Sequence, residues 1–335
     1  MTITKNKAML GMMLSAFGFS LYSIGDIFIK FSAAHYPPEK VAFFINMFFF
    51  PLILTVSSKV GGLRATLKTK HLKLHLLRSL LGMVVFFCMT TGFVKLGMAM
   101  SYTLIFSGPF IVSILSIFFL GEKIGIHRWS AIIMGFAGVL IVLRPGLNME
   151  LAAAGILLAA FCYAGSTLII RKIGEGEPLL AFSFYGQIVS TTLFGSMMLY
   201  KGEMSLPAIE HLWFFAATAV FHVFANFSVS RAFQISETSV AAPFQYVQLL
   251  WGIGAGLLLF HQGIDVWTGL GGAIIVGSGV YMIHRERVRH SELNTGVVAH
   301  GGALEDTGLN IEKTKEYSST EVANGDDIYA QGRHG

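Results

Sequence analysis

The sequence predicts an all-α integral membrane protein of ten transmembrane helices, arranged as two inverted five-helix repeats. Three observations predict this fold class. Charged residues make up only 13% of the chain and hydrophobic residues 54%, whereas about a quarter of the residues in a soluble domain are charged. Apolar segments of membrane-spanning length recur along the chain. The order of apolar segments, turn and Trp in residues 101–144 also recurs roughly 139 residues later, in residues 241–285.

The apolar segments have the roughly 17–25 residues that a hydrocarbon core of about 30 Å requires. They cover residues 9–32, 40–58, 74–94, 100–120, 129–144, 151–171, 179–199, 211–231, 240–260 and 265–284. Arg144-Pro145-Gly146 places a tight turn between the fifth and sixth segments. The first segment runs to about Ala33, which is too long for the core of a cleavable signal peptide.

Lys and Arg divide unevenly between the two sides of the expected membrane. With a cytoplasmic N-terminus, the inside segments hold sixteen of these residues, and the outside segments hold five: Lys30, Lys40, Lys95, Arg144 and Lys201. Short loops rich in Lys and Arg stay in the cytoplasm. Both termini are therefore expected to be cytoplasmic.

Five spans in each half is an odd number, so the second half must cross the bilayer upside down relative to the first. This geometry is typical of secondary transporters that work by alternating access. We expect one five-helix repeat in residues 1–146 and the second in residues 147–290. Residues 291–335 hold eight acidic and three basic residues and little apolar surface, which predicts a disordered cytoplasmic tail.

The two halves share a pattern of short motifs. Half one has Pro109, an apolar run to Leu120-Gly121-Glu122, then Trp129 and a Gly-x-x-Gly-Val-Leu string from Gly135; half two has Ala242-Pro243-Phe244, Tyr246, Trp267 and Gly277-x-Gly279. Together these motifs resemble the EamA repeat of the drug/metabolite transporter superfamily, over about residues 9–285. The resemblance implies ten helices, carriage of small organic metabolites and, with the charge asymmetry, a place in the cell inner (plasma) membrane.

One position departs from the family pattern. The Glu that usually closes the fourth span of a half is present as Glu122, but half two has His261 there. The residues Arg231-Ala232-Phe233 and 241–246 are most similar to family members that move riboflavin or S-adenosylmethionine.

Polar residues inside the spans are costly in a bilayer, so each one needs a reason. Asp26 and Lys30 lie four residues apart on one face of the first span and can pair. One interpretation is a gate or coupling site with Asp26 as a proton carrier. The other is that both lie near the outer end of the helix and Lys30 extends its ammonium group to the membrane surface.

The eighth span carries His222 and Asn226, again four residues apart. A His facing a wet cavity can bind substrate or titrate near neutral pH, whereas a hydrogen bond between helices is the simpler interpretation. Both remain open at the level of the sequence.

The ninth span begins with amide and aromatic side chains, which suit a planar ligand that forms hydrogen bonds. The candidates for substrate binding here are Gln245, Tyr246, Gln248 and Trp251, and their counterparts in the fourth span are Tyr102, Phe106 and Ser107. We favour a substrate site over plain helix packing. Tyr22, Tyr163 and Gln187 are further candidates for a cavity lining.

Signals for cofactors and catalysis are weak. The chain has no Gly-x-x-x-x-Gly-Lys-Ser/Thr loop for nucleotide phosphates and no His/Cys cluster with metal spacing. Cys88 and Cys162 lie inside apolar spans, which argues against a disulfide framework. We expect no cofactor, no metal, no catalytic residue and no nucleic-acid partner.

The leading hypothesis is therefore a secondary transporter that moves a small metabolite across the bilayer, with proton coupling through Asp26 or His222 as a further hypothesis. An amino acid, an amine, or a riboflavin-like or S-adenosylmethionine-like compound is the expected substrate. A membrane sensor or assembly partner, whose cytoplasmic tail recruits a protein, is the alternative. A lipid-modifying enzyme ranks last, and the sequence leaves the oligomeric state open.

Overall fold

The structure is a computed structural model, and it describes residues 5–59, 69–121, 125–144, 150–173, 179–235, 242–282 and 284–285. Every regular element in these residues is a helix, so the prediction of an all-α protein is confirmed. The described residues up to His284 form one compact unit. The expected tail at 291–335 lies outside the described residues.

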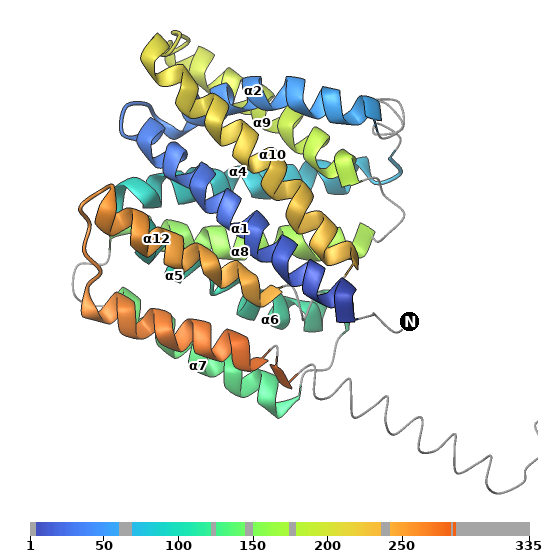
Figure 1. Cartoon of the computed structure of the whole chain (residues 1–335), viewed down its shortest axis with the longest axis vertical. Coiled ribbons are helices and arrows are strands. Elements are labelled where there is room, and N and C mark those ends of the chain that lie inside the picture. The colour runs from blue at the N-terminus through green and yellow to red at the C-terminus, as the bar shows by residue number, and fades with distance from the viewer. Residues whose placement is uncertain are drawn as a thin grey trace, which may run out of the picture. The chain divides into compact units, whose positions relative to one another are not determined.

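Helices lie along each segment that the apolar pattern predicts (Figure 1). The first half contains α1 (Lys5–Ala33), α2 (Pro38–Lys59), α4 (Leu72–Lys95), α5 (Met98–Ile105), α6 (Gly108–Leu120) and α7 (Ile126–Leu143). The second half contains α8 (Leu151–Ile173), α9 (Leu179–Lys201), η1 (Ile209–His211), α10 (Leu212–Ile235), η2 (Ala242–Tyr246) and α12 (Val247–Leu258). A last apolar helix covers Val266–Met282.

Seven candidate membrane spans in the described chain are long and apolar enough to cross a bilayer. They are Met9–Ala33, Pro38–Thr55, Leu72–Lys95, Met98–Phe119, Ile126–Leu143, Leu151–Ile170 and Ile209–Val229. Phe244–Leu258 and Val266–Met282 are shorter apolar helices. The chain thus has the elements of a multi-pass membrane protein.

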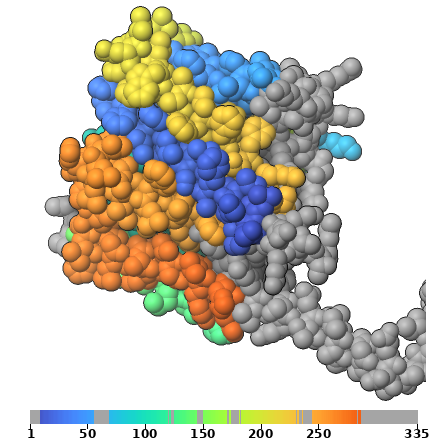
Figure 2. Space-filling view, in the orientation of Figure 1, coloured from blue at the N-terminus to red at the C-terminus, as the bar shows by residue number. Residues whose placement is uncertain are grey.

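The helices of the two halves are interleaved, and their contacts come in matching pairs. Helix α1 packs mainly on α10, as α8 packs on α4. Helix α2 contacts α10, as α9 contacts α4, while α2 and α9 contact each other. Figure 2 shows α1 on the surface between α10 and α12. Exchanging the halves leaves these particular contacts unchanged, as an internal two-fold repeat would, although smaller contacts such as α1 with α4 and α2 with α4 have no matching pair of similar extent among the described helices.

The fourth apolar segment, expected as one helix over 100–120, is two helices with a break at Phe106 and Ser107. Pro109 explains the break. Its ring has no N–H to bond the carbonyl of Ile105 and would clash with that carbonyl in a continuous helix. In the second half, the equivalent segment is the 3-10 helix η2, which contains Pro243. Both halves therefore depart from the α-helix at the same place in the repeat.

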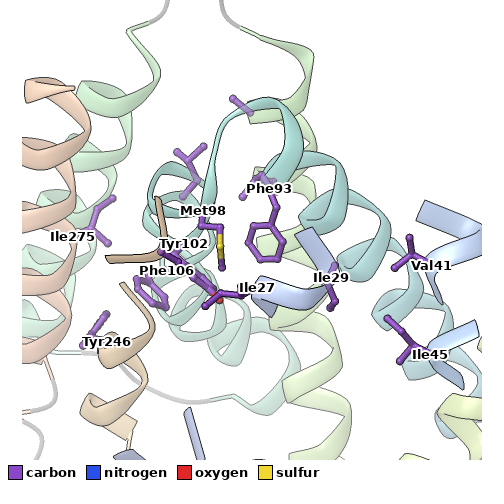
Figure 3. Close-up of a cluster of buried hydrophobic side chains, with 14 of the residues drawn as sticks. Ile27, Ile29, Val41, Ile45, Phe93, Met98, Tyr102, Phe106, Tyr246 and Ile275 are labelled. Atoms are coloured by element: carbon purple, nitrogen blue, oxygen red, sulfur yellow. The ribbon is translucent and has the colours of Figure 1, made fainter. Parts of the chain in front are cut away.

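The broken segments lie in the buried core, where α1, α4, α5 and α12 meet. Figure 3 shows Tyr102 and Phe106 between Met98 and Tyr246, with Ile27 of α1 reaching the same cluster. Tyr102 also lies against Gly252 of α12, where a Cβ would come within 2.6 Å of its ring. Close approach of α5 and α12 therefore requires a residue without a side chain at position 252.

Asp265 stabilises the start of the last helix. Its Oδ1 accepts hydrogen bonds from the backbone N–H groups of Trp267 at 3.0 Å and Thr268 at 3.2 Å, and from Arg144 Nη2 at 3.0 Å. Its Oδ2 accepts from the Thr268 hydroxyl at 2.6 Å. Burial alone would raise the pKa of Asp265, but these hydrogen bonds and the Arg144 charge outweigh it and hold the pKa below the ordinary 3.8.

We predict that Asp265→Ala lowers the free energy of unfolding by about 1 kcal/mol, the usual effect of removing a helix N-cap. A depressed carboxylate pKa stabilises the fold above the unfolded pKa and loses that effect as the pH falls through the folded value. The difference between wild type and variant should therefore be full at neutral pH and shrink below pH 3.8. Thermal unfolding in detergent across this pH range measures it, and a difference that is independent of pH would contradict the assignment.

Candidate functional site

The carboxylate of Asp26 is held between two other helices. The Tyr102 hydroxyl of α5 donates a hydrogen bond to Asp26 Oδ2 at 2.7 Å. His222 of α10 places Nε2 at 3.3 Å from Asp26 Oδ1, which is ion-pair distance when the imidazole is protonated, although the angle is not that of a hydrogen bond. The two side chains of this pair are only 16% and 20% exposed. A titratable pair thus lies in the apolar bundle, in contact with a buried tyrosine.

Glycine at position 25 makes room for the His222 ring. A Cβ there would come within 2.3 Å of His222 Cδ2 and 2.6 Å of Nε2. One turn before His222 on α10, the Thr218 hydroxyl donates to the Gly25 carbonyl at 3.4 Å. The imidazole can therefore reach Asp26 only because α1 presents bare backbone at this point.

Tyr22 and Asn226 extend this site by one turn on each helix. The Tyr22 ring meets the His222 ring edge-on at 5.3 Å between centroids, and its hydroxyl shares a hydrogen bond with Asn226. Tyr22 precedes Asp26 by four residues, and Asn226 follows His222 by four. Because α1 and α10 run antiparallel, these spacings bring the four side chains together. We call Tyr22, Asp26, Tyr102, His222 and Asn226 the central polar cluster.

Aromatic side chains from the broken segments adjoin the cluster. Phe106 stacks near Tyr102, with centroids 6.3 Å apart, and meets Tyr246 edge-on at 5.1 Å. Tyr163 of α8 lies against Gly108 at the start of α6, and it is close enough to Tyr22 and Tyr246 to interact electrostatically with both. Helices from both halves therefore contribute aromatic rings to one region (Figure 3).

Other predicted site residues lie apart from the cluster. Trp251 is 39% exposed on α12, and Gln245 of η2 and Gln248 of α12 are partly buried. Ser107 is fully buried, and its hydroxyl donates a hydrogen bond at 2.8 Å to the carbonyl of Leu104, three residues earlier in the chain. In the described chain, no hydrogen bond or ring contact links Gln248 or Trp251 to the cluster. Their roles in substrate binding remain predictions.

Lys30 does not pair with Asp26, as its spacing suggested, because each of the two side chains has a partner on another segment. Its side chain is 5% exposed, and its ammonium group donates a hydrogen bond to Gln262 Oε1. The same nitrogen lies 4.0 Å from the centroid of the Phe260 ring. The expected pair is absent because Asp26 turns toward α5 and α10, whereas Lys30 meets the link between α12 and the last helix.

Polar contacts also connect the loops and helix ends around the α1–α2 and α9–α10 connections. The Tyr36 hydroxyl accepts from the Ala208 N–H at 3.0 Å and lies 2.8 Å from His211 Nδ1. Glu39, which is almost fully buried, binds the Lys201 ammonium at 2.5 Å. The sequence analysis missed these residues and Gln262, because each looks like an ordinary loop or helix-end residue until its distant partner is known.

No group of three metal-binding side chains occurs in the described ranges. A groove of about 280 Å³ lies elsewhere, between α7 and the last helix, where it is bordered by Met134, Ile274 and Tyr281. Its surface is almost entirely apolar, so it lacks the polar groups that orient a metabolite. The central polar cluster is the better candidate site.

Comparison with known proteins places the fold in a family. The sequence profile of the EamA-like transporter family matches this chain twice, at residues 6–144 and 151–284. The chain belongs to the EamA-like transporter family. The two matches cover the two halves that the sequence pattern predicts.

Named relatives support the same class of protein. The chain is 29% identical over 280 residues to an S-adenosylmethionine uptake transporter of Rickettsia bellii, covering 79% of this chain and 90% of that protein. It is 24% identical to a riboflavin transporter of Rhizobium johnstonii (86% and 96% covered). It is 23% identical to the pseudopaline exporter CntI of Pseudomonas aeruginosa (79% and 93% covered).

A solved crystal structure also shares the fold, with a TM-score of 0.57 over 81% of this chain and 96% of the other, at 13% sequence identity. Family and relatives alike are transporters rather than enzymes. The prediction of a transporter is confirmed at this level, and the alternative of a tail-centred sensor finds no support.

We predict that Gly25→Ala displaces the His222 ring from Asp26, because the added Cβ occupies the space of the imidazole. Such overpacking costs about 1–3 kcal/mol, so the variant should unfold at a lower temperature in detergent and transport more slowly. Gly82→Ala is the matched control, since a Cβ at Gly82 of α4 meets nothing within 4 Å. Equal behaviour of the two variants would show that Gly25 has no special role.

Proposed function

We propose that the protein is a ten-helix secondary transporter, built from inverted repeats in residues 1–146 and 147–290, that carries a small organic metabolite by alternating access. The broken α5–α6 helix then forms the fourth crossing, and η2 with α12 the ninth. The matching helix contacts of the two halves and the double match to the family support this organisation. Both termini are cytoplasmic in this proposal, and the membrane is the cell inner membrane.

The observation that carries the proposal is the central polar cluster at the junction of the two halves. Asp26 and Tyr102 come from half one, and His222 comes from half two. A substrate bound at such a junction can be exposed to each side in turn when one half rocks against the other. Broken helices near the middle of the bundle are the usual binding elements of such transporters.

The chemistry of the cluster favours a polar metabolite with an aromatic part. Tyr22, Phe106 and Tyr246 offer ring faces or edges, Asn226 offers an amide, and Asp26 offers a carboxylate. An S-adenosylmethionine-like or riboflavin-like compound fits this set, and proteins with these names are among the relatives. Amino acids and amines fit the carboxylate and the aromatic rings as well.

Proton coupling fits the Asp26–His222 pair. When the pair holds an extra proton, the imidazolium and carboxylate attract each other at 3.3 Å and stabilise the contact of α1 with α10. When the proton leaves, the neutral imidazole holds the carboxylate less strongly, and Asp26 becomes available to a ligand. Protonation therefore biases the contact between the two halves, as coupling requires.

We predict that Asp26→Asn abolishes the response of transport to an imposed pH gradient while exchange of substrate across the membrane continues at a reduced rate. The carboxamide keeps the shape of the side chain but cannot carry a proton. Proteoliposomes with labelled S-adenosylmethionine or riboflavin measure both activities. Asp265→Asn is the control, because Asp265 lies outside the cluster. A wild-type rate that does not depend on the gradient would remove proton coupling from the proposal.

We predict that ten crossings place the exposed residues Glu150 and Glu203 outside the cell and Lys70 and His284 inside. Single-cysteine variants at these four positions, with Cys88 and Cys162 replaced by Ala, can be labelled with a membrane-impermeant maleimide. Positions 150 and 203 should react in intact cells, and positions 70 and 284 only after permeabilisation. Reaction of position 284 in intact cells would contradict the even number of crossings.

A further inference from the structure

Lys30 is a buried cation without an acidic partner among the described residues. In the described chain, its ammonium group contacts the neutral Gln262 amide oxygen and the face of the Phe260 ring. An ammonium group has three N–H donors, and a charge taken out of water is costly unless it is paired. One amide and one ring leave this charge only partly compensated, which needs an explanation.

Asp26 lies one turn below Lys30 on the same helix. Opposite charges four residues apart on a helix usually attract each other, yet each of these two is held by partners on other segments. Asp26 bonds Tyr102 and contacts His222, and Lys30 bonds Gln262. Asp26 and Lys30 are thus neighbours on one helix, but they do not neutralise each other, because each contacts partners on other segments.

We propose that Asp26 and Lys30 bind the two charges of an aminocarboxylate head group, so that the substrate is a zwitterionic, amino-acid-like metabolite. Asp26 accepts hydrogen bonds from the ligand's ammonium group, and Lys30 donates to its carboxylate. This inference rests on the proposed transport function and narrows its substrate class. It excludes neutral compounds such as riboflavin as the preferred cargo.

The spacing of the two residues suits such a head group. Residues four apart rise by about 6 Å along a helix. The ammonium nitrogen and carboxylate oxygen of an amino acid are about 3 Å apart, and a charge-assisted hydrogen bond at each end adds about 2.8 Å. The ligand with its two hydrogen bonds is longer than this rise between Cα atoms, and the flexible four-carbon stem of Lys30 adjusts the position of the ammonium group to it. A carboxylate has about four acceptor sites, so Asp26 can bind the ligand while Tyr102 still donates to Oδ2.

The rest of the ligand then meets the aromatic side of the cluster. Tyr22 lies one turn further along α1, below Asp26, and its ring contacts His222. Tyr163 and Tyr246 lie within electrostatic reach of one another beyond it. A flat or heteroaromatic group attached to the aminocarboxylate would stack here.

Binding of the carboxylate would also release a closed gate. Gln262 lies in the link between α12 and the last helix, and a Cβ at Gly97, in the link between α4 and α5, would lie 2.9 Å from Gln262 Oε1. Lys30 thus joins α1 to two links at the outer end of the bundle. A ligand carboxylate is a stronger acceptor for an ammonium than an amide oxygen is, so it would displace Gln262 and loosen this contact.

The test compares a zwitterion with its decarboxylated form on two proteins. The ligands are S-adenosylmethionine and decarboxylated S-adenosylmethionine, with tryptophan and tryptamine as a second pair. The proteins are wild type and Lys30→Gln, reconstituted at full length, with dissociation constants from thermal stabilisation in detergent and uptake in proteoliposomes. Lys30→Arg keeps the charge and serves as the rescue variant.

We predict that Lys30→Gln weakens binding of the zwitterion of at least one pair about tenfold or more, the effect of one charge-assisted hydrogen bond. Binding of its decarboxylated partner should change less than about twofold, and Lys30→Arg should recover most of the loss. Equal losses for both members of each pair would overturn the inference and leave the transport function standing.

Gln262→Ala separates a binding role of Lys30 from a purely structural one. This variant breaks the same hydrogen bond but keeps the ammonium group. If Lys30 binds substrate, removing its competitor should tighten binding of the zwitterion, whereas a structural role would make Gln262→Ala resemble Lys30→Gln. Uptake of riboflavin but of none of the zwitterions would also overturn the inference. Uptake of no compound at all would count against the proposed function, and with it against this inference.

Discussion

A carboxyl group inside an apolar helix bundle must find compensation in the protein, because an isolated charge at the centre of a bilayer costs about 2.5–3.5 kcal/mol on insertion scales. Asp26 finds it in Tyr102 of α5 and His222 of α10. Three helices are therefore fixed relative to one another by one side chain. Gly25 follows from the same constraint, since a side chain there would exclude the imidazole.

The two broken segments serve the same junction. Pro109 ends α5 after Ile105, and the 3-10 helix η2 precedes α12 at the equivalent place in the second half. Each break turns an aromatic residue, Phe106 or Tyr246, toward the other half. The contacts of α1 with α10 and of α8 with α4 pack the helices of the two halves against each other around this junction.

Lys30 connects the central polar cluster to the end of the bundle that holds the link between α12 and the last helix. It lies one turn from Asp26 on a single rigid helix, and its bond to Gln262 reaches the link that follows α12. Nearby, Tyr36 joins the link between α1 and α2 to the link between α9 and α10 through Ala208. In the proposed mechanism, ligand binding at Asp26 and Lys30 and closure of this end influence each other through α1.

The sequence by itself determined the helical class and the position of each apolar segment, and it singled out Asp26, His222 and Asn226 as candidate site residues. Hydrophobic length is a local property, and a polar residue within a span is conspicuous because the bilayer penalises it. Tertiary structure alone decided that Lys30 bonds Gln262, which is 232 residues away, and that Trp251 is partly exposed while Tyr102 is buried. These outcomes depend on how each helix is rotated against its neighbours. Packing across the whole bundle sets that rotation, and no short stretch of sequence encodes it.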